Sequence, residues 1–228
     1  VVIRGTVLDD WIVLEDEDTD PAVAGSMQVR STEQTFRFLV GGSPTDRISF
    51  LNPGTSLTVN LKAGDDILTI GEIDPAFAAS LSIAGDWGDD TLVGSDASNA
   101  WELAGEDAGT LNTLNSFTGI ENLVGGSDAD TFTFLAEGML SGMLAGGGGG
   151  EELVGPDRDA VWWITGKNQG ELTSSPAGEV LARFSDIENL TGGAGNEDSF
   201  VLTPEGSLNG LIDGGAGGDD SLVIQTAA

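Results

Sequence analysis

Residues 125–134 read Gly-Gly-Ser-Asp-Ala-Asp-Thr-Phe-Thr-Phe and contain the signals that decide the fold. The two glycines allow positive φ and a close approach of backbones, which a tight turn between stacked strands requires. After Asp130, polar and apolar residues alternate, which is the period of a strand with one buried face. The segment therefore predicts a glycine-rich turn, an acidic residue and a short strand, in that order.

The same order of turn, acid and strand recurs seven times along the 228 residues. The seven acids are separated by 20, 24, 40, 22, 46 and 22 residues, so the two long gaps are about twice the short ones. One structural unit of 20–24 residues explains every gap. We expect a degenerate turn inside each long gap, at residues 105–109 and 166–170. The acids that mark the units are Asp46, Asp66, Asp90, Asp130, Glu152, Asp198 and Asp220.

A longer duplication contains the short unit. Residues 120–126 (Ile-Glu-Asn-Leu-Val-Gly-Gly) match residues 187–193 (Ile-Glu-Asn-Leu-Thr-Gly-Gly) at six of seven positions. The match extends on both sides, so that long repeats cover about residues 101–155 and 162–224. Asn122 and Asn189 hold the same place in the two copies, and we expect each to hydrogen-bond to the neighbouring coil.

Stacking of the units leads to the fold prediction. One short strand pair cannot bury its apolar face alone, but each unit can bury that face against the next. Long helices are disfavoured because Gly, Asp, Asn and Thr recur too often. We predict an all-β fold, a parallel β-solenoid of about ten coils of 20–24 residues, in a single domain over residues 1–228. At ~4.8 Å per strand layer, such a rod is about 50 Å long.

The composition excludes several function classes. The chain has 38 acidic and 8 basic residues, a net charge of -30, and neither Cys nor His. Disulfides, thiolate zinc sites, haem ligation and Ser-His or Cys-His nucleophiles are therefore excluded. The negative charge disfavours nucleic acids and anionic membrane surfaces, and no apolar run is long enough for membrane insertion. The first residues show no initiator Met and no signal-peptide pattern, so we expect a piece of a longer protein.

The glycine-rich turns resemble the nonapeptide G-G-x-G-x-D-x-U-x of the RTX, or haemolysin-type calcium-binding, repeat family. Residues 85–93 match best, followed by residues 125–133 and 146–154. The resemblance implies Ca²⁺ held by turn carbonyls and carboxylates, because Ca²⁺ prefers oxygen ligands. The alternative is that each Asp hydrogen-bonds only its own turn. The candidate metal ligands are Asp46, Asp66, Asp89, Asp90, Asp128, Asp130, Glu152, Asp198, Asp219 and Asp220.

This chain departs from the RTX pattern because its turns come once per 20–24 residues instead of in tandem. The longer repeat is similar to segments of giant, acidic, secreted bacterial surface proteins. The resemblance implies an extracellular structural or adhesive protein without enzymatic activity, part of a cell-surface filament, sheath or large adhesin. Its expected partners are further copies, associated end to end or as neighbouring protomers, and glycans.

Two other functions stay open. A carbohydrate-active β-helix, such as a polysaccharide lyase, resembles this architecture, but the few Arg and Lys residues do not cluster with acids at one corner. A glycan-binding module would use Trp101, Trp162 and Trp163 as a stacking platform, although we expect these side chains in the core. Adjacent paired acids cannot converge on one substrate, because neighbouring strand residues face opposite sides. Acidity also suits a saline habitat.

Overall fold

The computed structural model describes residues 1–17, 25–32, 38–40, 43–112 and 115–227. In these residues every regular element is a β-strand, so no helix there is available to cross a membrane. The strands are β1 (Val2–Arg4), β2 (Trp11–Asp16), β3 (Ser26–Ser31), β4 (Phe38–Val40), β5 (Ser43–Thr45), β6 (Arg47–Leu51), β7 (Ser56–Ala63), β8 (Ile67–Ile70), β9 (Ser80–Trp87), β10 (Thr91–Val93), β11 (Ala100–Gly105), β12 (Ala108–Leu111), β13 (Asn115–Thr118), β14 (Asn122–Gly126), β15 (Thr131–Phe134), β16 (Met143–Gly147), β17 (Glu152–Val154), β18 (Ala160–Gly166), β19 (Gln169–Ser174), β20 (Val180–Ser185), β21 (Asn189–Thr191), β22 (Asp198–Leu202), β23 (Ile212–Asp213) and β24 (Ser221–Ile224).

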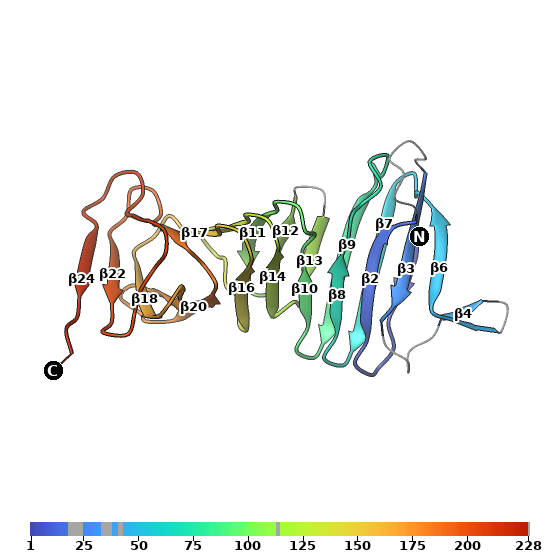
Figure 1. The fold of residues 1–228 in the computed structure, drawn as a ribbon, viewed down its shortest axis with the longest axis horizontal. Helices are drawn as coiled ribbons and strands as arrows, with labels where there is room; N and C mark the ends of the chain where they lie inside the picture. Colours follow the sequence, from blue (N-terminus) through green and yellow to red (C-terminus); the bar gives the residue numbers. More distant parts are fainter. Residues whose placement is uncertain (18–24, 33–37, 41–42, 113–114, 228) are drawn as a thin grey trace.

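Two large, mostly parallel sheets run along an elongated molecule (Figure 1). Sheet A has the order β1-β7-β9-β13-β12-β11-β15-β17-β21-β23, and sheet B has the order β24-β22-β18-β19-β20-β16-β14-β10-β8-β2-β3-β6. The chain passes repeatedly from one sheet to the other, so that β7 pairs in parallel with β9, and β8 with β10. The all-β prediction is confirmed, and the two sheets are consistent with stacked coils. We call one crossing of each sheet a coil.

The core lies between the sheets and is built from side chains in register. In sheet B, Leu68 pairs with Leu92, Leu92 with Leu123, and Leu123 with Leu144, and all four are fully buried. The strands that follow an acid alternate as expected. In β15, Phe132 and Phe134 are buried, whereas Thr131 and Thr133, which alternate with them, are half-buried. Each coil thus buries the apolar face of the one before it.

The long gaps between acids contain antiparallel strands, which corrects the prediction of degenerate corners. In sheet A, β12 pairs antiparallel with both β11 and β13, and in sheet B β19 pairs in the same way with β18 and β20. Residues 105–109 and 166–170 form the first hairpin turn of each set. Asp107 and Asn168 adopt φ of 51° and 54° there, a left-handed conformation that Asp and Asn tolerate. We call each three-stranded antiparallel set a meander.

The strand order repeats three times, once more than the sequence indicated. Repeat 1 runs from β1 to β9, repeat 2 from β10 to β16, and repeat 3 from β17 to β23. Each has one strand, a meander in the other sheet, and three strands that alternate between sheets. Repeat 1 also contains the hairpin β4–β5, which forms a two-stranded sheet of its own. Each repeat therefore passes through sheet A or sheet B five times, with the meander counted as one pass. The meander lies in sheet B in repeat 1 (β2-β3-β6), in sheet A in repeat 2 and in sheet B in repeat 3.

Three such repeats plus β24 make sixteen half-coils in the described residues, or eight coils, fewer than the ten predicted. Repeat 1 is not detected by comparing the sequences of the repeats, because it has Ile12 where repeats 2 and 3 have Trp101 and Trp162. Ile12, Trp101 and Trp162 hold the same register position on the first meander strand, opposite Leu68, Phe132 and Phe200 of the next coil.

Candidate functional site

The inner acids are the carboxylates directly before a core strand or, for Asp198, at its first residue, and most of them are buried. Asp10, Asp66 and Asp90 precede β2, β8 and β10 and are at most 1% exposed. Asp10 N donates to Asp66 Oδ1 (2.5 Å), and Asp66 N donates to Asp90 Oδ1 (2.9 Å). The series ends where Asp90 N donates to Glu121 Oε2 (2.7 Å). Asp66, Asp90 and Glu121 therefore each accept a hydrogen bond from the coil beside them, which forms a ladder along the edge of the molecule. At its start, the Asp10 carboxylate accepts from Thr6 N (2.5 Å) of its own turn.

The same arrangement follows the change of sheet in repeats 2 and 3. Asp130, before β15 in sheet A, accepts from Asn99 N (2.6 Å) and Asn99 Nδ2 (2.9 Å). Glu188 Oε2 accepts from Glu151 N (3.1 Å). In sheet B, Asp198 N donates to Asp220 Oδ1 (2.9 Å).

An outer ladder of exposed acids runs in the opposite direction, one residue before the inner one. Asp65 N donates to Asp9 Oδ1 (3.1 Å), and Asp89 N donates to Asp65 Oδ1 (3.0 Å). In repeat 3, Glu197 N donates to Asp159 Oδ1 (2.9 Å). Consecutive acids thus bond to the coils on their two opposite sides, which explains why acids occur in adjacent pairs at these turns.

A glycine five or six residues upstream makes room for most inner acids. A Cβ on Gly85, Gly125 or Gly192 would lie 2.4, 2.2 and 2.3 Å from Oδ2 of Asp90, Asp130 and Asp198, respectively. The same Cβ would lie 1.8–2.4 Å from a backbone carbonyl oxygen of the next coil. Real Cβ atoms do not approach other atoms so closely, so glycine is required here for space.

Burial changes the acid–base properties of this ladder. It raises the pKa of Asp66 to about 7, of Asp90 to about 6 and of Glu151 to about 7. It also raises the pKa of Glu121, Asp130 and Asp198. One carboxylate oxygen of Asp66, Asp90, Asp130 and Glu151 is buried without a hydrogen-bond partner in the described structure. A proton on that oxygen removes the cost of a buried charge.

The structure places the predicted metal ligands in several different settings. Asp66, Asp90, Asp130 and Asp198 are buried inner acids, and Asp220 is the exposed inner acid before β24. Asp89 is an outer acid, Asp219 is exposed one residue before Asp220, and Asp128 is exposed in the turn before Asp130. Glu152 lies on β17, where its Oε1 accepts from Thr191 Oγ1 (2.7 Å). Asp46 is exposed between β5 and β6, outside the ladders.

Sequence reasoning missed several members of the ladders. Glu151, and not Glu152, is the buried inner acid before β17, so the register expected there is off by one residue. Asp10 was missed because repeat 1 has diverged, and Glu121 and Glu188 because their turns lack the glycine run. An acid directly before each Asn-Leu pair was the available signal for Glu121 and Glu188. The expectation for Asn122 and Asn189 is confirmed, because their Oδ1 atoms accept from Met143 N (2.9 Å) and Leu211 N (3.1 Å) of the neighbouring coil.

The ladder has the oxygen chemistry of a Ca²⁺ site but only part of the geometry. Carboxylates and turn carbonyls are the ligands that Ca²⁺ prefers. In the part of the chain that the structure describes, however, no three Asp or Glu side chains converge on one point. Each coil supplies at most one acid to each ladder, so an ion between coils would depend on no more than two carboxylates and on turn carbonyls.

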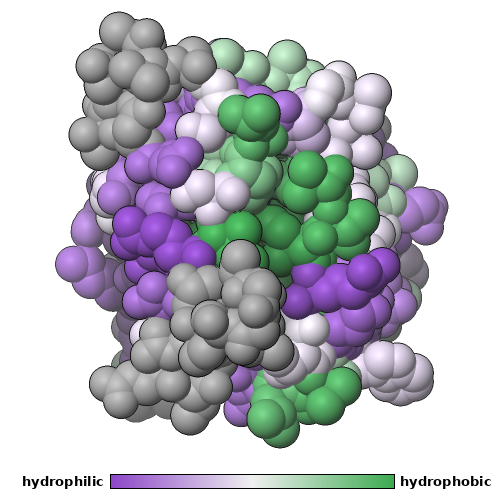
Figure 2. Space-filling model, turned by 90° about the vertical axis from the view of Figure 1, so that its right-hand side faces the viewer, coloured by the Kyte–Doolittle hydropathy of each residue, from purple (hydrophilic) through white to green (hydrophobic). Residues whose placement is uncertain are grey.

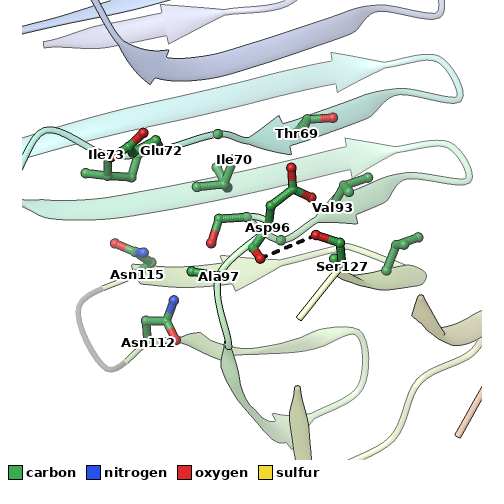
Figure 3. Close-up of a pocket in the computed structure, with 15 residues that line it drawn as sticks. Thr69, Ile70, Glu72, Ile73, Val93, Asp96, Ala97, Asn112, Asn115 and Ser127 are labelled. Atoms are coloured by element: carbon green, nitrogen blue, oxygen red, sulfur yellow. Dashed lines mark hydrogen bonds between the residues drawn. The ribbon is translucent and has the colours of Figure 1, made fainter. Parts of the chain in front are cut away.

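A hollow of about 740 Å³, lined by both apolar and polar residues, lies where β8, β10 and β14 end (Figure 3). Glu72 and Asp96 contribute carboxylates, and Ser127 Oγ donates to the Asp96 carbonyl oxygen (3.4 Å). Asn112 is held in place by the backbone, since its Oδ1 accepts from Ala100 N (2.8 Å). No aromatic ring is among the described residues of its lining, so the hollow has no stacking platform for a sugar.

The tryptophans considered for sugar stacking lie mostly in the core, as expected. Trp101 stacks on Phe132 (ring centroids 5.7 Å apart) and Trp162 on Phe200 (5.4 Å), and both tryptophans are 0% exposed. Trp163 is half-buried on the other face of β18. Trp87, at the end of β9, is 81% exposed instead.

A scan against protein-family models and comparisons with curated proteins and with solved structures each found no match to this chain.

Proposed function

We propose that this chain is a β-solenoid segment of an extracellular structural or adhesive protein, such as a bacterial cell-surface filament, sheath or large adhesin. The supporting observation is the unbroken pairing of both sheets along the molecule, reinforced by acid ladders at the turns. A rod held in this way is a stiff spacer that displays its loops to glycans or to neighbouring protomers. The proposal assigns no catalytic step to the chain.

Ca²⁺ is proposed as a rigidifying ion at the turns. Outer acids of adjacent coils, such as Asp65 and Asp89, lie in the turns before β8 and β10, which are paired strands ~4.8 Å apart. Such a pair of charges repels by about 1 kcal/mol in bulk water and by about 3–4 kcal/mol at an effective dielectric of 20. With a net charge of -30 on the chain, a divalent cation that binds between outer acids would stabilise the folded rod.

The test is thermal unfolding of chelated protein during titration with Ca²⁺, with NaCl of equal ionic strength as the control for screening. We expect millimolar Ca²⁺ to raise the melting temperature by several degrees more than NaCl does, and the double variant Asp65→Asn/Asp89→Asn to lose most of this gain. A melting temperature that Ca²⁺ and NaCl change equally would refute the calcium proposal. Small-angle X-ray scattering of the same samples tests the rod separately.

Glycan binding is the second candidate function, and one observation favours it. Trp87 presents an exposed ring two residues before the outer acid Asp89. A polysaccharide lyase needs a base and several acids gathered in one site. Arg30, Lys62 and Arg183 lie on different strands, and each is paired with a single acid there, so they form no such site together. A glycan array with Trp87→Ala as the matched variant tests binding, and an assay for unsaturated products tests lyase activity.

A further inference from the structure

The junctions between repeats inside the molecule are built in one way. At each junction, the last strand of one repeat pairs in parallel with the third meander strand of the next repeat, as in β9–β13 and β16–β20. Ile83 stands opposite Phe117 in the first junction, and Leu144 stands opposite Phe184 in the second. All four side chains are at most 1% exposed. A pair of apolar residues in register therefore closes the core at every internal junction.

Half of the same junction is present at one end of the molecule, on β6. This strand is the third meander strand of repeat 1, and its outer edge has no partner strand among the described residues. Ile48 holds the position of Phe117 and Phe184, since it pairs with Val29 as they pair with Gly109 and Gly170. Unlike the two phenylalanines, Ile48 is only half-buried.

Val29, the residue paired with Ile48 on the neighbouring strand, agrees with this assignment. A Cβ on Gly109 or Gly170 would lie 2.9 or 2.8 Å from the facing phenylalanine ring, so these glycines leave space for the rings. Repeat 1 has Val29 instead of glycine and Ile48 instead of the larger phenylalanine, which keeps the pair similar in volume. Apolar surface gathers at the centre of this end of the molecule (Figure 2).

The other half of the junction is on β23, at the opposite end of sheet A. This strand is the last of repeat 3, as β9 and β16 are the last of theirs. Ile212 pairs with Leu190 as Leu144 pairs with Leu123, so Ile212 holds the position of Leu144. It is half-buried where Leu144 is fully buried, and the preceding residue, Leu211, is 74% exposed.

We infer that two copies of this chain join head to tail, with β23 of one copy pairing in parallel with β6 of the next and Ile212 opposite Ile48. The two internal junctions, β9–β13 and β16–β20, use the same strand positions and the same register. The inference rests on the proposed function as an end-to-end rod and names its contact. Because the meander changes sheet in every repeat, sheet A of one copy continues into sheet B of the next.

β1 is the strand that has to move when two copies join. β24 is equivalent to β10 and β17, the first strands of repeats 2 and 3, which pair with β14 and β21, the strands that follow the meander of the same repeat. The equivalent position in the second copy lies beside β7 and is filled by its own β1. β1 has three residues, and Val1 and Val2 are 51% and 54% exposed. In the joined rod, β24 therefore takes the place of β1.

Cysteine crosslinking tests the register, since the chain has no cysteine of its own. One preparation carries Ile48→Cys and the other carries Ile212→Cys; they are mixed and oxidised in about 1 M NaCl, where the Debye length is only ~3 Å and repulsion between copies is screened. Paired residues on parallel strands lie ~4.8 Å apart, within the roughly 4.4–6.8 Å Cα range of disulfides. We expect a disulfide-linked dimer of one copy of each variant.

Ser49→Cys is the matched control, because Ser49 is exposed on the opposite face of β6. Mixed with Ile212→Cys, it should give at least ten times less crosslinked dimer. Deletion of residues 1–4 should raise the yield for the Ile48→Cys pair, because β24 then has no competitor. Equal yields for the two β6 variants, or no dimer at all, would overturn the inference. If the crosslinking fails but small-angle X-ray scattering shows a rod-shaped monomer, the head-to-tail inference is wrong and the proposed function stands. A globular monomer would refute both the inference and the proposed function.

Discussion

At the residue scale, the inner acids combine two roles that conflict at neutral pH. One oxygen of Asp66 or Asp90 accepts a backbone hydrogen bond from the neighbouring coil, which favours the ionised form. The other oxygen is buried without a partner, which favours the protonated form. Desolvation is the larger effect, and it holds the pKa of both groups at about 6–7 in the folded state. The ladder is therefore most stable when these acids carry protons.

The stability of the protein should fall as the pH rises from about 4 to about 8. In this range the folded state binds more protons than the unfolded state, whose Asp pKa is about 4, so stability is gained below that value and lost through pH 6–7. Asp66→Asn and Asp90→Asn keep the Oδ1 acceptor and remove the charge. We expect each to raise the melting temperature at pH 8 by about 2–4 °C per kcal/mol gained, and to flatten its pH dependence.

Asp65→Asn is the control for net charge, since Asp65 is the exposed acid beside Asp66. Differential scanning fluorimetry between pH 5 and pH 8 is sufficient as the measurement. If Asp65→Asn and Asp66→Asn gave the same pH profile, the buried oxygen would have no special effect. If Asp66→Asn lowered the melting temperature at pH 8, the assignment of the ladder as a protonated network would be wrong.

At the element scale, local pattern was enough for the coils and failed for the meanders. The alternation after Asp130 and Asp198 predicted β15 and β22 because a half-buried strand has a local signature. Residues 105–109 have the same glycines and acids as a corner, yet they form a hairpin. Their conformation depends on the pairing of β11 with β15, a contact that residues 105–109 do not specify. The turn sequence also could not show that Glu151, and not Glu152, is the buried acid, because the register of β17 is set by its pairing with the neighbouring strands.

The aromatic stack on the first meander strand should anchor the meander to the next coil. Trp101 is fully buried, with its ring on Phe132 and its edge toward Phe117. Trp101→Ala should lower the free energy of unfolding by about 3–5 kcal/mol, as for other buried aromatics replaced by alanine. Trp87→Ala removes an exposed ring and should change it by less than about 0.5 kcal/mol. Urea unfolding followed by circular dichroism compares the two, and equal losses would contradict the core assignment.

At the scale of the whole molecule, charge and architecture act in opposite directions. The net charge of -30 favours an expanded chain, whereas the paired sheets and the buried leucine columns hold it compact in cross-section and long in one direction. The chain has 8 basic residues for 38 acidic ones, and in the part that the structure describes Arg30, Lys62 and Arg183 each lie within 4 Å of a carboxylate, at partly exposed sites. Such pairs contribute at most about 1 kcal/mol each. Burial between stacked coils is thus the main source of stability.

The central claim, that coils stack in one continuous rod, is tested most directly by a distance between the two ends of sheet B. Spin labels on Ser49→Cys in β6 and Ser221→Cys in β24 sit on exposed positions of the two edge strands, eleven strand steps apart. At ~4.8 Å per step, double electron–electron resonance on dilute protein should give one narrow distance of about 50 Å. A distance below roughly 35 Å, or a broad distribution, would contradict the stacking of these strands in one sheet.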